Sequence, residues 1–298
     1  MTTIPFSRKI LSVAILTTLL AACGGGGGDS SPNTNITPTV TEGTITGTAV
    51  KGILQKALIT AYKVTTDGQK GEKLTEGTTD DAGAYSLKVT GYSGAVLLEM
   101  TSGANTKMLC DIPAGCDGTA FGSAVSAKDL TLQTVLSELK ATNKTAITPF
   151  THLAAKYATQ KGLNKANIEA ALTQIADLFN LPALNETTAV NPASDLSTAT
   201  ATEQQYAIMN AAVAQLAGKV ADISSKLNAL SAEINAKNGQ LQSSGAAGLD
   251  LADVLAEAKK VTESGKLKNL NSTIKTILAT QLAVAEKNTT VTTANPST

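Results

Sequence analysis

The sequence predicts an α+β protein, with an N-terminal antiparallel β-sandwich followed by a C-terminal Ala-rich α-helical bundle. Two observations support this class. Between residues 43 and 127, short runs of Val, Ile, Thr, Leu and Tyr alternate with Gly, Asp and Asn, which is typical of strands and turns. From residue 149 onward, apolar residues recur at spacings of three and four, which is the period of an amphipathic helix.

The chain begins with a segment that has the features of an export signal. Arg8 and Lys9 precede an apolar run, 10–22, which is shorter than the roughly 20 residues that a bilayer-spanning helix needs. The run ends in Leu-Ala-Ala-Cys, and this motif resembles the lipobox of bacterial lipoproteins. The resemblance implies a signal peptide at 1–22 and makes Cys23 the first mature residue, carrying palmitate-type acyl chains.

The segment 23–42 combines this cysteine with a tether of Gly, Ser, Thr, Asn and Pro, a composition typical of flexible linkers. In Gram-negative lipoproteins, Asp directly after the cysteine favours retention in the inner membrane, whereas this chain has Gly24. We therefore expect a lipid anchor in the outer membrane. Both the periplasmic face and the cell surface remain open as the side on which the protein is displayed.

Composition excludes some classes of function. The chain has 24 Lys and Arg against 24 Asp and Glu, and it contains no Trp. Its single arginine, Arg8, belongs to the expected leader. Arginine forks supply most phosphate and guanine contacts, so we expect no binding to nucleic acid. The scarcity of aromatic residues also argues against a carbohydrate-binding platform.

The β-rich region 43–127 contains several candidate strands that are too close together for crossover helices between them. This spacing predicts antiparallel pairing. Asp67-Gly68 and the run from Thr79 to Gly83 have turn compositions. The candidate strands are Thr44–Val50, Ala57–Val64, Ala84–Val89, Ala95–Met100 and Thr106–Cys110.

Four features of this region occur together: a Gly-containing opening strand, an Ala-x-Ile-x-x-Tyr strand, a T-D-x-x-G-x-Y turn into the next strand, and an apolar strand after it. The first three lie in GTAVKG…ALITAYKVTTDGQKG…TTDDAGAYSLKV. This stretch, about 43–102, resembles the carboxypeptidase regulatory-like family, a transthyretin-type (prealbumin-like) β-sandwich, and the resemblance implies a non-catalytic accessory module. The downstream segments MLCDIPAGCDGTAFG and AITPFTHLAAKYA resemble a group of proteobacterial lipoproteins with the same two-part layout and no assigned function.

The two remaining cysteines, Cys110 and Cys116, lie in the string CDIPAGC. An exported protein meets an oxidising compartment, and the intervening Pro and Gly suit a tight turn, so we expect a local disulfide. A metal site is the rival interpretation, but it needs further ligands, and the chain's one histidine, His152, is distant in sequence.

The segment 128–148 is expected to be a hairpin or connector before the helical bundle, 149–288, and a disordered tail, 289–298. Thr148 is a suitable N-cap residue with Pro149 as the first helical residue. Gly162 is expected to end this helix and Asn164 to cap the next one. Two later helices are expected over 251–262 and 267–287.

The most regular pattern in the chain is a heptad repeat over 203–237. One continuous helix would be about 50 Å long. A break near Gly218 would fold the same residues into two packed helices, and we favour the break because a compact bundle buries more apolar surface. The apolar positions are Tyr206, Met209, Val213, Leu216, Val220, Ile223, Leu227, Leu230 and Ile234.

Candidate residues for catalysis or metal binding are few. His152 lies among apolar residues with no convincing nucleophile nearby, which favours a core histidine over a catalyst. Asp80 and Asp81, together with Asp67, have oxygen ligands for Ca²⁺, but turns require the same residue types, so no metal site is assigned.

A covalent cross-link is a further candidate. Lys51 or Lys56, with Glu99 and Asn105, could form an intramolecular isopeptide bond of the kind found in some adhesin sandwiches. Such a bond needs a buried, apolar setting, and the sequence alone does not test the pairing.

Together these observations favour a non-enzymatic lipoprotein that displays both parts for contact with a protein or another component of the cell envelope, without a cofactor. Two alternatives remain open. One is a surface-exposed adhesin or ligand-capture lipoprotein. The other is a hydrolase with a carboxylate-based site, although no Asp or Glu pair stands out. The sequence leaves the partner and the oligomeric state undetermined.

Overall fold

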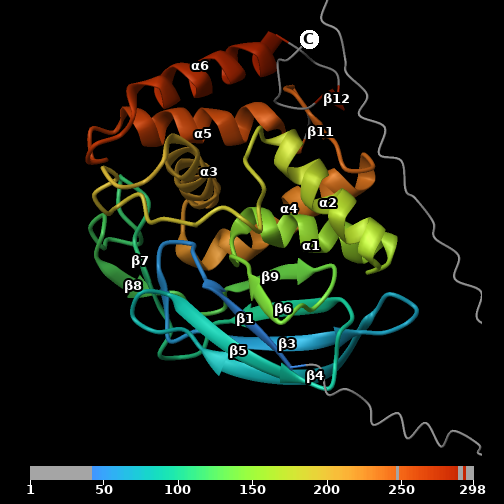
Figure 1. Ribbon diagram of the computed structural model, residues 1–298. Helices are drawn as coiled ribbons and strands as arrows, with labels where there is room; N and C mark the ends of the chain where they lie inside the picture. The colour runs from blue at the N-terminus through green and yellow to red at the C-terminus, as the bar shows by residue number, and fades with distance from the viewer. Residues whose placement is uncertain (1–41, 246–247, 288–290, 293–298) are drawn as a thin grey trace, which may run out of the picture. The chain divides into compact units, whose positions relative to one another are not determined.

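A computed structural model of the chain describes residues 42–245, 248–287 and 291–292. In this part of the chain, β-sheets are followed by helices that pack against them, which confirms the α+β class (Figure 1). The expected leader, Cys23 and almost all of the tether lie outside the described residues, as does most of the tail 289–298. None of the described helices combines the length and apolar character needed to cross a membrane.

In the part of the chain that the structure describes, the strands between residues 42 and 144 form three sheets, and a short pair lies near the C-terminus. In chain order the strands are β1 (Glu42–Thr48), β2 (Leu54–Gln55), β3 (Leu58–Val64), β4 (Lys70–Thr78), β5 (Ala84–Thr90), β6 (Val96–Thr101), β7 (Lys107–Leu109), β8 (Ala124–Ser126), β9 (Thr131–Leu136), β10 (Thr142–Lys144), β11 (Leu241–Gln242) and β12 (Val291–Thr292). All five expected strands are present with shifted ends. Strand β4 was not expected, because it is a polar edge strand with no buried residue.

The largest sheet has the order β4-β3-β6-β9 and is antiparallel throughout. A three-stranded sheet has the order β10-β1-β5, in which β1 runs antiparallel to β5 but parallel to β10. The parallel pair corrects the expectation of purely antiparallel strands. It can form because β1 and β10 are connected through the whole intervening β-rich chain rather than by a tight turn. The third sheet has the order β2-β7-β8.

The helices of the described residues are α1 (Pro149–Lys161), α2 (Lys165–Leu178), α3 (Ala201–Ala217), α4 (Ile223–Ala236), α5 (Leu251–Glu263) and α6 (Ser272–Lys287), with a 3-10 turn η1 (Val220–Asp222). The start of α1 is confirmed, because the Thr148 side chain accepts the N–H of Thr151 and Pro149 is the first helical residue. Gly162 ends α1, and the Asn164 side chain caps α2 as expected.

The heptad pattern over 203–237 is divided between two helices that contact each other. Helix α3 ends just before Gly218, which has a φ of 78° that other residues rarely adopt, and α4 begins at Ile223. This confirms the expected break. Helix α6 begins at Ser272, later than predicted, because the preceding residues form turns in which Asn269 has a φ of 58°.

The segment 128–148 does not form a hairpin, which was one of its two expected forms. Its two strands do not pair with each other as a hairpin would: β9 extends the largest sheet beside β6, and β10 joins β1. Five consecutive residues of β9, from Leu132 to Leu136, are buried, so both faces of this strand are covered. Helix α1 packs against β9 (Figure 1).

One continuous hydrophobic core therefore extends through the sheets and the helices. Ile45 and Leu98 from the two larger sheets belong to the same cluster as Phe150, Ile208 and Leu255 from the helices, and all five are fully buried. Helices α1 and α3 are buried on nearly every side, which is typical of central helices.

The expected disulfide is present in the loop after β7. The Sγ atoms of Cys110 and Cys116 are 2.11 Å apart, and both cysteines are fully buried. The loop turns at Gly115, whose φ is 104° and whose N–H donates to the carbonyl of Ile112.

Candidate functional site

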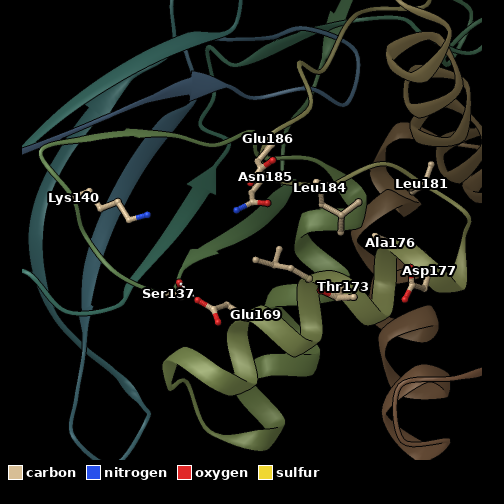
Figure 2. A pocket seen from close by; sticks show the side chains of 12 residues that line it. Ser137, Lys140, Glu169, Thr173, Ala176, Asp177, Leu181, Leu184, Asn185 and Glu186 are labelled. Atoms are coloured by element: carbon tan, nitrogen blue, oxygen red, sulfur yellow. Dashed lines mark hydrogen bonds between the residues drawn. The ribbon is translucent and has the colours of Figure 1, made fainter. Parts of the chain in front are cut away.

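A hollow of about 490 Å³ opens between helix α2, the β9–β10 loop and the chain that follows α2 (Figure 2). We call it the α2 groove. It is lined by Ser137, Lys140, Glu169, Leu172, Thr173, Ala176, Asp177, Leu181, Ala183, Leu184, Asn185 and Glu186.

Asn143 fixes the β9–β10 loop, which forms one wall of the groove. Its Oδ1 accepts the backbone N–H of Lys140 at 3.0 Å, and its Nδ2 donates to the carbonyl of Lys140 at 2.7 Å. The same Nδ2 donates to the carbonyl of Thr44 in β1 at 3.1 Å. Asn143 is buried, and its bonds hold the backbone of Lys140 at the rim of the groove. The side chain of Lys140 is exposed.

Two contacts connect this wall to α2. The hydroxyl of Ser137 donates to Oε1 of Glu169 at 3.0 Å. Nearby, Nζ of Lys165 lies 3.0 Å from Oε2 of Glu138, and the hydrogen bond from this lysine lowers the pKa of Glu138. Both contacts are exposed, so each is expected to contribute little to stability, although both join the β9–β10 loop to α2.

The groove continues along the outer edge of β10. An adjoining hollow of about 190 Å³ shares four lining residues with the α2 groove and adds the strand residues Thr142, Asn143 and Lys144. Within the described residues β10 pairs with β1 alone, and the residues of this edge strand line the hollow. Nζ of Lys144 donates to the hydroxyl of Thr188 at 3.3 Å.

The lining of the groove carries charged groups of both signs, namely the carboxylates of Glu169, Asp177 and Glu186 and the amine of Lys140. Glu169 and Asp177 are eight positions apart on α2, a rise of about 12 Å along the axis, whereas glycosidase carboxyl pairs lie about 5–10 Å apart. Figure 2 shows these two side chains at different ends of the groove. Among the described residues, no cluster of three or more His, Cys, Asp or Glu is suited to a metal ion.

His152 lies in the core and lines neither of these hollows. Only 3% of the residue is exposed, and its Nδ1 has no hydrogen-bond partner in the structure. Burial, followed by the charge of Lys156, lowers the pKa of His152 to about 3. The imidazole is therefore neutral at physiological pH.

The aspartates considered for Ca²⁺ make the bonds of turns. Oδ1 of Asp80 accepts the N–H groups of Ala82 at 2.9 Å and Ala84 at 2.8 Å. Asp67 accepts a hydroxyl from its own turn, and Asp81 is exposed beside a different hollow. These contacts match the usual use of Asp in turns.

The four residues considered for an isopeptide bond are not brought together. Lys56 and Asn105 line an open hollow, while Glu99 contacts side chains of β4 and β9. Lys51 is fully buried, but its partner is Asp111, a residue that the sequence did not indicate.

The groove itself was not predicted, because its walls come from three segments that are separate in the sequence. The loop after α2 supplies Asn185 and Glu186 to the groove, and its richness in Asn, Thr and Pro is the one feature of the sequence that indicates a surface segment there. No family model matches the chain, and neither curated proteins nor solved structures gave a match.

Proposed function

We propose that this chain is a non-enzymatic lipoprotein anchored in the outer membrane through acyl chains on Cys23. The observation that carries the proposal is the motif Leu-Ala-Ala-Cys at the end of a short apolar run that follows two cationic residues. Each buried methylene of an acyl chain contributes about 0.8 kcal/mol, so two or more chains hold a protein stably without any membrane-spanning helix.

We also propose that the two larger sheets form a transthyretin-type sandwich and that the helices form an Ala-rich bundle. In support, edge strand β4 of one sheet contacts β5 of the other, and one face of β5 buries Tyr85, Leu87 and Val89. Alanine supplies many of the buried positions of α3, which lets neighbouring helices approach closely.

The α2 groove and its extension along β10 are the proposed contact surface for a protein or envelope partner. No aromatic ring is among the lining residues of either hollow, so the stacking that sugar-binding sites commonly use is missing there. The mixture of Lys140 and Lys144 with Glu169, Asp177 and Glu186 fits a partner that carries both signs of charge rather than a polyanion.

The anchor is tested by replacing the cysteine. Cys23→Ser should abolish labelling with radioactive palmitate and release the protein from the membrane fraction. Gly24→Ala is the matched control and should leave both unchanged, whereas Gly24→Asp should keep the label but move the protein to the inner membrane. Palmitate labelling of Cys23→Ser would show that the lipid is carried elsewhere.

The contact surface is tested by a photo-crosslinking amino acid in living cells. Thr173 is an exposed groove residue on α2, and Thr276 is an exposed threonine on α6 outside the groove. We expect a defined adduct from position 173 that Asp177→Lys weakens, and no such adduct from position 276. Identical adducts from both positions would contradict a role for the groove.

A further inference from the structure

Lys51 and Asp111 form a charged pair that is closed off from water. Lys51 lies in the turn between β1 and β2, and Asp111 lies in the loop that follows β7. Nζ of Lys51 is 2.7 Å from Oδ1 and 2.6 Å from Oδ2 of Asp111, so it is held close to the carboxyl carbon. The exposed fractions of the two side chains are 0% and 1%.

The surrounding backbone holds both groups in place. The N–H of Gly52 donates to Oδ2 of Asp111 at 2.9 Å. Gly52 has a φ of 57°, and an added Cβ would lie 1.8 Å from the carbonyl oxygen of Leu109, so only glycine fits this position. Asp111 also lies inside the loop that the Cys110–Cys116 disulfide closes, which restricts movement of its carboxylate.

Burial makes the ionic form of this pair unfavourable. Desolvation lowers the pKa of Lys51, and the charge and hydrogen bond of Asp111 oppose that effect. Removing two charges from water costs free energy that their mutual attraction only partly offsets. A reaction that converts both ions into one neutral group would remove this cost.

We propose that Lys51 and Asp111 condense to an intramolecular amide, which covalently joins the β1–β2 turn to the disulfide loop. This modification is independent of the proposed function.

In this reaction a proton passes from the ammonium group of Lys51 to the Asp111 carboxylate, and the free Nζ lone pair attacks Cγ. The N–C bond forms, one C–O bond breaks, and the departing oxygen leaves as water with two of the three Nζ protons. One proton remains on the amide nitrogen, so no oxidant or other reactant is needed. The N–H of Gly52 is placed to donate to the oxygen that becomes negative in the intermediate. Holding amine and carboxyl in contact replaces an improbable encounter with a unimolecular step.

The test is mass spectrometry of the full chain after reduction and digestion with a protease that cuts after Glu. Lys51 then lies in peptide 43–72 and Asp111 in peptide 100–138. The proposal expects one linked species with the summed mass of the two peptides less one water, and fragmentation that places the link on Lys51. Recovery of both peptides at their sequence masses, with no linked species, would overturn the proposal.

Variants identify the reacting groups. Lys51→Met should abolish the linked species, and its persistence would overturn the assignment. Asp111→Asn should give a linked species of the same mass as the wild type, because ammonia leaves in place of water. Lys70 and Glu99 are the internal control, since this exposed pair has its charged atoms at 3.0 Å and should remain unlinked. The wild-type measurement decides the question even if a variant does not fold.

Discussion

Acidification from pH 7 to pH 5 should lower the free energy of unfolding through the single histidine of the chain. Burial, with a smaller effect of Lys156, lowers the native pKa of His152 from 6.5 to about 3. Because the native pKa is depressed, the contribution that the neutral His152 makes to stability is fully present above pH 6.5. It is lost progressively as the pH falls from 6.5 toward 3. In that range the unfolded chain binds a proton that the native state excludes. The free energy of unfolding therefore falls by about 1.36 kcal/mol for each pH unit. The expected loss between pH 7 and pH 5 is therefore about 1.9 kcal/mol.

The assay is urea unfolding followed by circular dichroism at pH 7, 6 and 5 and constant salt, for the wild type and His152→Gln. Glutamine does not titrate, so the variant should lose about 1.9 kcal/mol less than the wild type over this interval. Carboxylates titrate mainly below pH 5, and their effect is the same in both proteins. The comparison depends on the change with pH and not on the absolute stability of the variant.

Parallel losses in the wild type and His152→Gln would refute this reasoning. A second variant, Lys156→Gln, separates the two causes of the pKa shift. Because burial is the larger cause, the variant should keep a lowered native pKa and retain most of the stability loss of the wild type at pH 5. A loss in Lys156→Gln close to that of His152→Gln would mean that the lysine charge, and not burial, depresses the pKa.

Three further predictions concern the framework of the fold. Gly47→Ala should destabilise the protein by roughly 3 kcal/mol or more in denaturant titrations, because an added Cβ would lie 1.7 Å from the carbonyl oxygen of Thr145. Gly103→Ala, with open space around it, is the control and should change stability by less than about 1 kcal/mol. Cys116→Ser should cost about 2 kcal/mol, and reductant should then have no further effect on its unfolding midpoint. A fragment of residues 43–127 should show no cooperative thermal transition by circular dichroism, because it lacks β9 and β10; a sharp transition would contradict the shared core.

Features with local causes could be predicted from the sequence. The caps at Thr148 and Asn164 and the break at Gly218 depend on residues within one helical turn, so the pattern of neighbours was sufficient. The Cys110–Cys116 disulfide was predictable for the same reason, since its loop is short and contains turn residues.

Features that depend on distant segments were missed or assigned differently. Strand β4 is polar and gains its regular structure from pairing with β3, so its own sequence has no apolar alternation. Strand β10 joins β1 across most of the β-rich region, and no local signal specifies that partner. The contact of Lys51 with Asp111 and the walls of the α2 groove have the same origin, because they depend on how the finished sheets and helices meet.

The position of β1 has a mechanical consequence. Under the proposed anchoring, any drag on the displayed part of the protein is transmitted through the tether to Glu42, the first residue of this strand. Strand β1 lies between β5 and β10, so a pull along its axis shears two ladders of hydrogen bonds at once instead of peeling one edge bond by bond. The strand order therefore places the tether at a point of the fold that resists force. The rate at which β1 shears away from β5 and β10 would govern unfolding under force.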